Sequence, residues 1–426
     1  MADGALGDTV GGDEEFLRAT VQEAHRAARP LRIIGGGSKA FYGRAVAADA
    51  APLHTAGHHG VAHYDPAELV LTARAGTPLA AVEELLAAEN QMLGFEPPRF
   101  GDGGGDGGAA DDGDGGDSGG ETAAGDGDGD GGDGGNTGRG SIGGAVAAGL
   151  AGPRRPYTGA VRDFVLGVKI VSGRGETLRF GGEVMKNVAG FDLSRLMAGA
   201  LGTLGVLLEI SLRVLPRPAA QQTLRLEHAA PAAAVALFNR LAARPLPLSA
   251  AAWHLGETRI RLSGSDAGVA RAAAIIGGEA DPAGGEFWRR LRDHELAFFA
   301  AAPELLRVSL PPASAWAPPD SAAQLIDWGG AQRWLAADDA NGVQELRATV
   351  AQHGGHVTRF RHGGRGPGDS GAPGDGGGDD GDRDRDNNPA EIFHPLPAPL
   401  YQLHRRLKRA FDPAGILNPG RLHPDG

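Results

Sequence analysis

Apolar residues recur at helical spacing after Asp13 and predict the first ordered element. The carboxylate of Asp13 can cap the first turn of a helix, and Pro30 ends the helical pattern. The apolar run over residues 31–34 then predicts a strand that leads into three glycines. We therefore expect order from residue 13 and disorder over residues 1–12. The apolar positions of this helix are Phe16, Leu17, Val21, Ala24 and Ala28.

Strand and helix patterns alternate up to residue 218. A strand is predicted over residues 69–76, and Thr77 and Pro78 provide the N-cap and first position of a helix. The pattern predicts an α+β domain over residues 13–218, with glycines at the joints between elements. Further strands are predicted over residues 164–171, 177–180 and 205–216, with a short helix that begins at Asp192.

The composition of the sequence changes after Pro218. Glycine clusters become rarer, and amphipathic helical patterns such as residues 232–243 appear. We predict a second, smaller α+β domain over residues 219–426. Its last helix has an apolar face of Leu400, Leu403, Leu407 and Phe411. The basic residues of this helix are predicted to be solvated charge near a helix C-terminus, and they are Arg405, Arg406, Lys408 and Arg409.

Two Gly/Asp-rich segments interrupt these domains. Residues 101–138 hold eleven acidic and no basic side chains, and residues 363–388 hold seven Asp and three Arg. Both have too few apolar residues to offset the entropy of ordering, so we predict disordered insertions. The formal net charge of the chain is −12, and the two segments carry −11 and −4, so the rest carries about +3. This balance favours neither a nucleic-acid binder nor a membrane-surface protein.

Calcium binding is an alternative function for the first Gly/Asp-rich segment. Asp126, Asp128 and Asp130 resemble the start of an EF-hand loop. Such a loop needs a bidentate Glu at its twelfth position, which here is Thr137. The incomplete ligand set favours a solubilising insertion over a calcium site.

The sequence contains no cysteine, which excludes disulfides, thiolate nucleophiles and an iron–sulfur cluster held by this chain. The N-terminal residues lack the basic and apolar regions of a signal peptide. The longest apolar run, residues 196–208, is too short to span a bilayer. We expect a cytoplasmic protein, with at most peripheral association with the inner membrane. Histidine spacing predicts no metal site.

The glycines of residues 35–37 can approach a phosphate in three ways. A Walker loop is excluded because Ser38 precedes Lys39, the reverse of that motif. A dinucleotide fingerprint fits Gly35, Gly37 and Ala40, but no helical pattern follows on which a pyrophosphate could lie. The third possibility is a nest of backbone N–H groups around an anion.

Three further glycine clusters favour the nest. They are residues 140–144, 159–164 and 181–207. Each allows the main chain to approach a long ligand at a different point, although tight turns and close helix packing use glycine in the same way.

With these glycine clusters, the sequence resembles the vanillyl-alcohol oxidase and p-cresol methylhydroxylase (PCMH) family of FAD-binding proteins. More narrowly, it is similar to the E-subunit family of bacterial glycolate oxidase. The resemblance spans about residues 13–423 outside the Gly/Asp-rich segments. It implies a PCMH-type FAD-binding domain of two α/β subdomains, followed by a smaller α+β domain. The stretches that carry it include "GGGSKAFYGR", "FGGEVMKNVAGFDLSRLM", "QLIDWGGAQRWL" and "FDPAGILNPGR".

The resemblance also implies residues that would bind FAD. Residues 35–39 would hold the pyrophosphate, and residues 140–144 would lie along the ribityl chain. The implied set is Gly35, Gly36, Gly37, Ser38, Lys39, Gly76, Pro97, Gly140, Ser141, Ile142, Gly143, Gly144, Arg162, Asp163, Lys186, Asn187, Gly190, Asp192, Gly205, Val206, Asn418 and Arg421. Lys186 and Arg421 are the candidates for a cation near the N1 atom of the flavin. No cysteine, and no clearly placed His or Tyr, is available to attach the flavin, so we expect FAD to bind non-covalently.

The sequence departs from the family pattern in two places. The first insertion falls between "EPPRFG" and "GSIGG", where the family has a short loop that contacts the flavin. The second begins at "RHGGRGPGDSG", where catalytic relatives carry a metal and substrate motif that is not recognisable here.

The resemblance implies a flavoprotein subunit of an enzyme that oxidises glycolate, and D-lactate as a further substrate, to the 2-oxo acid. Its implied partners are a second FAD subunit that binds the hydroxy acid and an iron–sulfur subunit, with no nucleic acid. One alternative is a self-sufficient 2-hydroxy-acid dehydrogenase with Arg154 or Arg155 as substrate anchor. Another is an assembly subunit that binds no FAD. No catalytic residue is predicted.

Overall fold

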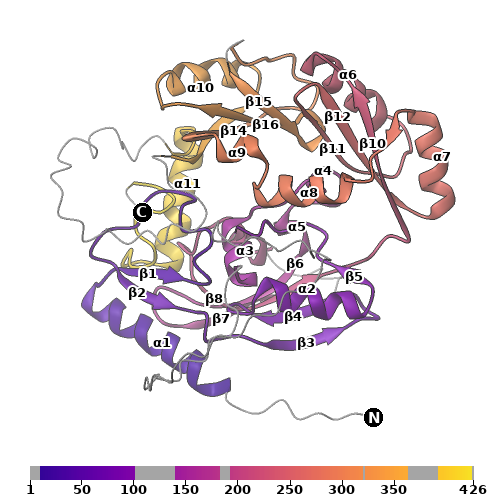
Figure 1. The fold of residues 1–426 in the computed structure, drawn as a ribbon. Helices are drawn as coiled ribbons and strands as arrows, with labels where there is room; N and C mark the ends of the chain where they lie inside the picture. The colour runs from indigo at the N-terminus through magenta and orange to yellow at the C-terminus, as the bar shows by residue number, and fades with distance from the viewer. Residues whose placement is uncertain (1–9, 101–139, 183–191, 320–321, 363–391, 425–426) are drawn as a thin grey trace, which may run out of the picture.

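The computed structural model describes residues 10–100, 140–182, 192–319, 322–362 and 392–424. Two sheets form two units that lie one above the other in Figure 1, and a closing segment, residues 392–424, connects them. The predictions for both Gly/Asp-rich segments, including the calcium alternative, fall outside the described residues.

The N-terminal unit is built on an antiparallel five-stranded sheet in the order β3-β4-β8-β6-β7, with a small parallel pair β1-β2 beside it. A two-stranded pair, β5-β9, closes its edge. The strands are β1 (Leu31–Ile34), β2 (Ala51–His54), β3 (Val61–Asp65), β4 (Val70–Arg74), β5 (Gln91–Met92), β6 (Val165–Val171), β7 (Thr177–Gly181), β8 (Val206–Arg213) and β9 (Leu215–Pro216). The helices are α1 (Val10–Ala27), α2 (Leu79–Ala88), α3 (Ile142–Ala148), α4 (Arg155–Thr158), α5 (Val161–Phe164) and the 3₁₀ turn η1 (Ser194–Met197).

Apolar residues on both faces of the central strand β8 explain this layering. One face contributes Ile210 and Leu212 to a core with the buried side of α2 and α3. The other face contributes Val206 and Leu208 to a second core with α1, β1 and β2. A strand that is covered on both faces has a nearly continuous apolar sequence, as β8 has.

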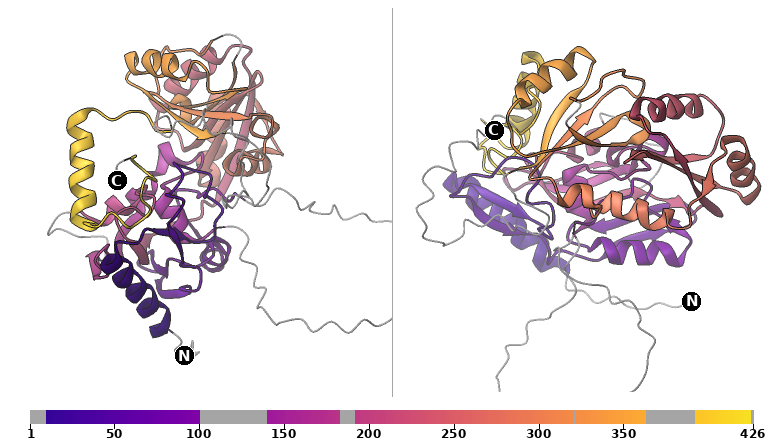
Figure 2. Two further views of the ribbon diagram at one scale, coloured as in Figure 1. Left: turned by 90° about the vertical axis from the view of Figure 1, so that its left-hand side faces the viewer. Right: turned by 45° about the horizontal axis from the view of Figure 1, so that its top comes forward.

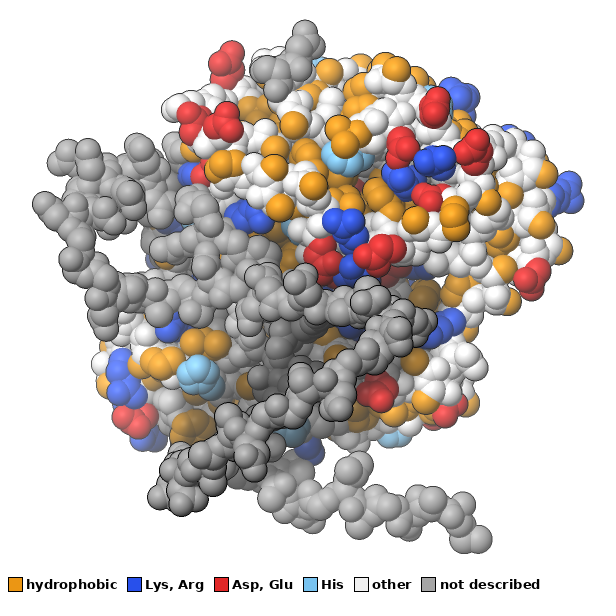
Figure 3. Space-filling view, viewed as in Figure 1, with side chains coloured by type: hydrophobic (Ala, Val, Ile, Leu, Met, Phe, Trp, Pro, Cys, Tyr) orange, Lys and Arg blue, Asp and Glu red, His pale blue; other side chains and the backbone are white. Residues whose placement is uncertain are grey.

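The C-terminal unit is an eight-stranded sheet whose observed pairs are antiparallel, in the order β13-β10-β12-β11-β15-β16-β14-β17. Its strands are β10 (Ala220–Glu227), β11 (Leu248–His254), β12 (Glu257–Gly264), β13 (Glu279–Ala280), β14 (Glu304–Ser309), β15 (Ala323–Asp327), β16 (Gln332–Ala337) and β17 (His356–Arg361). Its helices are α6 (Pro231–Ala242), α7 (Asp266–Ile276), α8 (Gly284–Asp293), α9 (Ala297–Ala300), α10 (Val343–Gln352) and the turn η2 (Trp328–Gly330). On the face shown in Figure 3, charges of both signs are interspersed over this unit.

The closing segment returns the chain to the N-terminal unit. Helix α11 (Ala398–Phe411) stands at the edge of the molecule beside both units (Figure 2, left). Phe411 joins the core that the five-stranded sheet forms with α2 and α3, and Leu417 pairs in parallel with Leu31 of β1. The final residues therefore pack with the first strand, although the sequence pattern placed them in the second domain.

Three expectations about helices differ from the structure. Helix α1 begins at Val10, three residues before the predicted cap at Asp13. In α11 the predicted apolar face is not a buried face, because Leu400 is 41% exposed and Leu403 is 50% exposed. Lys408 is not solvated charge: its ammonium group donates to Asp412 Oδ2 at 2.7 Å and to the carbonyls of Thr203 and Leu417.

Candidate functional site

The glycine loop after β1 has N–H groups that donate to no group among the described residues. Within the part of the chain that the structure describes, the N–H groups of Gly36, Gly37 and Lys39 have no acceptor. Gly37 has a φ of +73°, which glycine adopts without strain, and a Cβ added there would meet nothing within 4 Å. An open loop of unpaired N–H groups is a binding site for an anion such as a phosphate.

The loop that precedes α3 lies directly against the glycine loop. A Cβ at Gly36 would be 3.1 Å from Cα of Gly140, and a Cβ at Gly35 would be 2.8 Å from Oγ of Ser141. Gly140 in turn has room only for a hydrogen, since a Cβ there would be 2.8 Å from Oγ of Ser38. The structure therefore brings together residues 35–39 and 140–141, which are a hundred residues apart in the sequence.

The first amides of α3 are used inside the protein. Ile142 N–H donates to the Thr77 carbonyl at 2.9 Å and Gly143 N–H donates to the Ala75 carbonyl at 2.8 Å. Gly144 N–H donates to Oγ of Ser141 at 3.2 Å. The donors that remain for a phosphate therefore belong to residues 36–39 rather than to the start of this helix.

Lys39 supplies a positive charge beside this loop. Burial lowers its pKa to about 8, against which the charge of Asp293 acts weakly. Its ammonium group lies 5.6 Å from the centroid of the Phe100 ring and 3.4 Å from Oγ of Ser38. A phosphate bound at the neighbouring N–H groups would offset the burial and raise this pKa.

Asn418 and Arg421 hold the glycine loop in place through hydrogen bonds to its backbone and to neighbouring backbone. Asn418 accepts from Ile33 N–H at 2.7 Å and donates to the Leu201 carbonyl at 2.7 Å. The guanidinium of Arg421 donates to the carbonyls of Ala40 at 2.8 Å and Tyr42 at 2.6 Å, and further to those of Lys39 and Arg44. Burial lowers the pKa of Arg421 to about 10. Arg421 thus positions the loop, and its place near N1 of the flavin remains a prediction.

The remaining predicted residues lie in varied surroundings. Gly76 is buried where a Cβ would be 2.4 Å from the Thr55 carbonyl, and Pro97 is buried in the loop that leads to Phe100. A Cβ at Gly205 would be 2.8 Å from Cδ1 of Ile170, and Val206 is in the core. Lys186, Asn187 and Gly190 lie outside the described residues.

Three of the predicted polar residues lie at the surface. Asp163 accepts from Ala160 N–H at 2.8 Å and so orders its turn, while Arg162 is exposed. Asp192 pairs with Arg195 at 2.7 Å and accepts from Ser194. Their predicted place near FAD remains a prediction.

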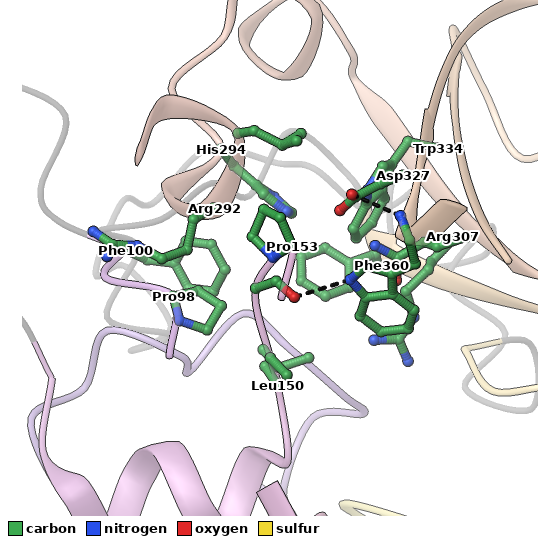
Figure 4. Close-up of a pocket in the computed structure, with 15 residues that line it drawn as sticks. Pro98, Phe100, Leu150, Pro153, Arg292, His294, Arg307, Asp327, Trp334 and Phe360 are labelled. Carbon is green, nitrogen blue, oxygen red and sulfur yellow. Dashed lines mark hydrogen bonds between the residues drawn. The ribbon is translucent and has the colours of Figure 1, made fainter. Parts of the chain in front are cut away.

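A pocket opens between the two units (Figure 4). The N-terminal unit contributes Pro98, Phe100 and residues 150–153, and the C-terminal unit contributes the polar and aromatic side chains. Those side chains are Arg292, His294, Arg307, Asp327, Trp328, Gln332, Trp334 and Phe360. Aromatic walls with a few polar groups resemble those of small-ligand sites, but the free volume of this pocket, about 20 Å³, holds little more than one water molecule.

Two ionisable side chains of this pocket, Asp327 and His294, have pKa values that burial shifts toward the neutral form. Asp327 is 3% exposed, and burial raises its pKa to about 7. Its Oδ1 accepts from Trp328 N–H at 2.7 Å. Burial, together with the charges of Arg361 and Arg307, holds the pKa of His294 well below its usual value, so this imidazole is neutral at pH 7. Arg307 donates to the Tyr42 hydroxyl at 3.0 Å.

A buried carboxylate next to this pocket joins the two units. Glu96 accepts from the side chain and the N–H of Arg154 and from Arg261 of β12, at distances of 2.8 to 3.2 Å. Arg154 donates further to Gln221. Arg154 is therefore engaged in a structural ion cluster, which corrects its assignment as a substrate anchor. Arg155 packs over the Trp328 ring at 4.3 Å.

No sequence pattern indicated the polar residues of the pocket. They come from separate helices, turns and strands, and no local spacing relates Arg307 to Asp327 or Phe360. The available signal was the stretch "QLIDWGGAQRWL", which contains Asp327, Trp328, Gln332 and Trp334 and carries part of the resemblance. Within the described ranges, no three His, Asp or Glu side chains are grouped to hold a metal, and no helix has the length and apolar character to cross a bilayer.

Comparisons with known proteins agree with this geometry. The FAD binding domain family matches residues 10–126, and the family "FAD linked oxidases, C-terminal domain" matches residues 396–422. The glycolate oxidase subunit GlcE of Escherichia coli (strain K12) is 39% identical over 414 residues, which are 96% of this chain and 98% of that protein. The glycolate oxidase subunit GlcD of Bacillus subtilis (strain 168) is 37% identical over 108 residues, which are 25% of this chain and 23% of that protein.

The fold has relatives of much lower sequence identity. A structure of p-cresol methylhydroxylase aligns with a TM-score of 0.60 at 14% identity, and covers 96% of this chain and 87% of that chain. An alkyldihydroxyacetonephosphate synthase aligns with a TM-score of 0.59 at 14% identity, and covers 95% of this chain and 75% of that chain. These two likenesses concern the fold alone.

The chain is therefore an FAD-dependent oxidoreductase with a PCMH-type FAD-binding fold. The free N–H groups at residues 36–39 and the closely packed glycines fit an FAD pyrophosphate. Within this class, the chain belongs to the family of the glycolate oxidase subunit GlcE. The predicted family, fold class and cofactor are confirmed.

Proposed function

We propose that this chain is a cofactor-carrying, electron-relaying subunit of a multi-subunit glycolate oxidase, in which a second FAD subunit binds the hydroxy acid. An iron–sulfur subunit would accept the electrons, and D-lactate would be a further substrate of the complex. The observation that carries this proposal is the full-length similarity to a protein named as a glycolate oxidase subunit. The partial similarity to GlcD supports a complex of related flavoprotein subunits.

Some residues of this chain would bind FAD directly, and others would hold the binding loop in place. The N–H groups of Gly36, Gly37 and Lys39 would bind the pyrophosphate, while Arg421 and Asn418 keep that loop in place. When it is bound, the flavin supplies hydride and one-electron transfer. The aromatic pocket would exclude water from the reacting end of the cofactor, and the FAD is expected to be non-covalent.

A second candidate function is a self-sufficient 2-hydroxy-acid dehydrogenase. It is favoured by the pocket, where Arg307 could hold a carboxylate and Asp327 could accept a proton. The absorption spectrum of the purified chain, before and after acid precipitation and then with anaerobic glycolate, separates the two. We expect acid-released FAD and no bleaching by glycolate. Bleaching would select the self-sufficient enzyme, and a chain that cannot be reconstituted with FAD would contradict both.

The Gly36→Val substitution is expected to weaken FAD binding. The new side chain would begin 3.1 Å from the Gly140 backbone and would separate the two loops that form the phosphate site. We expect a dissociation constant at least about tenfold higher, which corresponds to about 1.4 kcal/mol, measured by titrating the apoprotein with FAD and following fluorescence.

The matched control is Gly57→Ala, since a Cβ at Gly57 would meet nothing within 4 Å and Gly57 lacks a positive φ. Both variants should retain the circular dichroism of the parent. Equal FAD affinity of the Gly36→Val variant and the parent would contradict the assignment of this loop.

A further inference from the structure

A buried ion pair lies at the end of helix α11. The ammonium group of Lys408 donates to Oδ2 of Asp412 at 2.7 Å, and the two side chains are 12% and 0% exposed, respectively. A Cβ added at Gly173, in the turn between β6 and β7, would be 2.3 Å from Oδ1 of Asp412, so the main chain of this turn covers the carboxylate. Burial of two charges has a desolvation cost, so a pair of this kind is weak evidence for stabilisation alone.

The ion pair holds the backbone of Leu417 at both of its polar groups. Asp412 accepts from Leu417 N–H at 2.8 Å and from Ile416 N–H at 3.2 Å. Lys408 donates to the Leu417 carbonyl at 2.8 Å and to the Thr203 carbonyl at 3.0 Å. The two side chains therefore fix this backbone against the loop that precedes β8. We refer to Lys408 and Asp412 as the α11 clasp.

The backbone that the α11 clasp holds also pairs with β1. Leu31 N–H donates to the Ile416 carbonyl at 2.7 Å, and Asn418 N–H donates to the Leu31 carbonyl at 2.9 Å. The Asn418 side chain accepts from Ile33 N–H, two residues before the first glycine of the glycine loop. A continuous series of hydrogen bonds thus leads from the α11 clasp to the loop that fits the FAD pyrophosphate.

We propose that Lys408 and Asp412 are positioning residues for FAD, which set the place of the glycine loop through the backbone of residues 416–418. The inference rests on the FAD binding in the proposed function and does not depend on the relay role. Coupling between separate sites can travel through a chain of hydrogen-bonded groups. Such coupling is reciprocal, so FAD bound at the glycine loop should in turn stabilise the backbone that the α11 clasp holds.

The test is a titration of the purified full-length apoprotein with FAD, followed by flavin fluorescence. The variant combines Lys408→Met with Asp412→Asn, because removal of both charges leaves neither one buried without its partner. We expect the dissociation constant for FAD to rise about tenfold or more. The matched control combines Arg359→Met with Glu304→Gln, an ion pair of the C-terminal sheet whose side chains are 4% and 7% exposed, and should leave this constant unchanged. An equal loss of FAD affinity in both double variants would overturn the inference, because the α11 clasp would then contribute stability alone.

Hydrogen exchange of the parent chain tests the reciprocal effect and needs no variant. We expect saturating FAD to slow exchange of the Ile416 and Leu417 amides more than that of the amides in β17, the strand that contains Arg359 of the control pair. Equal slowing in both places would overturn the inference, even if the clasp variant does not fold. Bleaching by glycolate would contradict the relay role alone, whereas unchanged FAD affinity of the clasp variant would overturn this inference alone.

Discussion

Glu96→Ala is expected to lower the free energy of unfolding by about 3–5 kcal/mol. The substitution leaves the guanidinium groups of Arg154 and Arg261 buried and without their shared carboxylate. Burial opposes ionisation of Glu96, but the charges of Arg261 and Arg154 outweigh it and lower the pKa. The contribution of Glu96 is therefore present above the unfolded-state pKa of about 4.5 and is lost as the pH falls through the lowered folded-state value. Urea unfolding at pH 7 and at pH 4 measures both effects.

Two variants test whether the buried charge is responsible. Glu96→Gln keeps the shape and should be destabilising at pH 7, with a difference that shrinks in acid. Glu15→Ala removes an exposed partner of Arg18 on α1 and should have no measurable effect. If Glu96→Ala and Glu15→Ala have equal stabilities at pH 7, the cluster does not hold the two units together.

Asp327→Asn is expected to stabilise the chain at pH 8, by at most about 4 kcal/mol. Burial raises the pKa of Asp327 from 3.8 to about 7. The stability that the protonated carboxyl contributes is fully present below pH 3.8 and is lost as the pH rises through about 7. Asparagine stays neutral, so its advantage should grow from about pH 4 to pH 7 and then level off. Thermal or urea unfolding over this range gives the curve.

Asp327→Ala provides the control for this prediction. Alanine also removes the charge, but it deletes the acceptor for Trp328 N–H, so its gain at pH 8 should be smaller by about 1 kcal/mol. A stability difference between Asp327→Asn and the parent that does not vary with pH would contradict a raised pKa. Destabilisation by asparagine at pH 8 would contradict it as well.

The pattern of apolar residues along the chain predicted several of the strands. The runs over residues 31–34, 164–171 and 205–216 correspond to β1, β6 and β8 because the apolar sequence of each strand matches its burial on the sheet. The glycine loop could likewise be predicted from the sequence. Glycine suits the positive φ at Gly37 and the close approach of the Gly140 backbone to Gly36.

Long-range contacts account for what the sequence did not predict. Arg154 and Arg421 were assigned to a ligand from their positions in motifs, but partners far away in the chain engage both side chains. The apolar face of α11 was read as buried because periodicity shows a stripe and not what covers it. The pocket could not be predicted from the sequence either, since Arg307 and Asp327 lie on different strands.

The return of the closing segment has a consequence for the order of synthesis. The ribosome makes β1 and its glycine loop long before Leu417, Asn418 and Arg421, which pair with β1 and hold the loop. A chain made only as far as β9 contains all five strands of the sheet but lacks the groups that fix the phosphate loop. Flavin loading would then follow the synthesis of the closing segment, and yellow colour would mark chains that contain this segment.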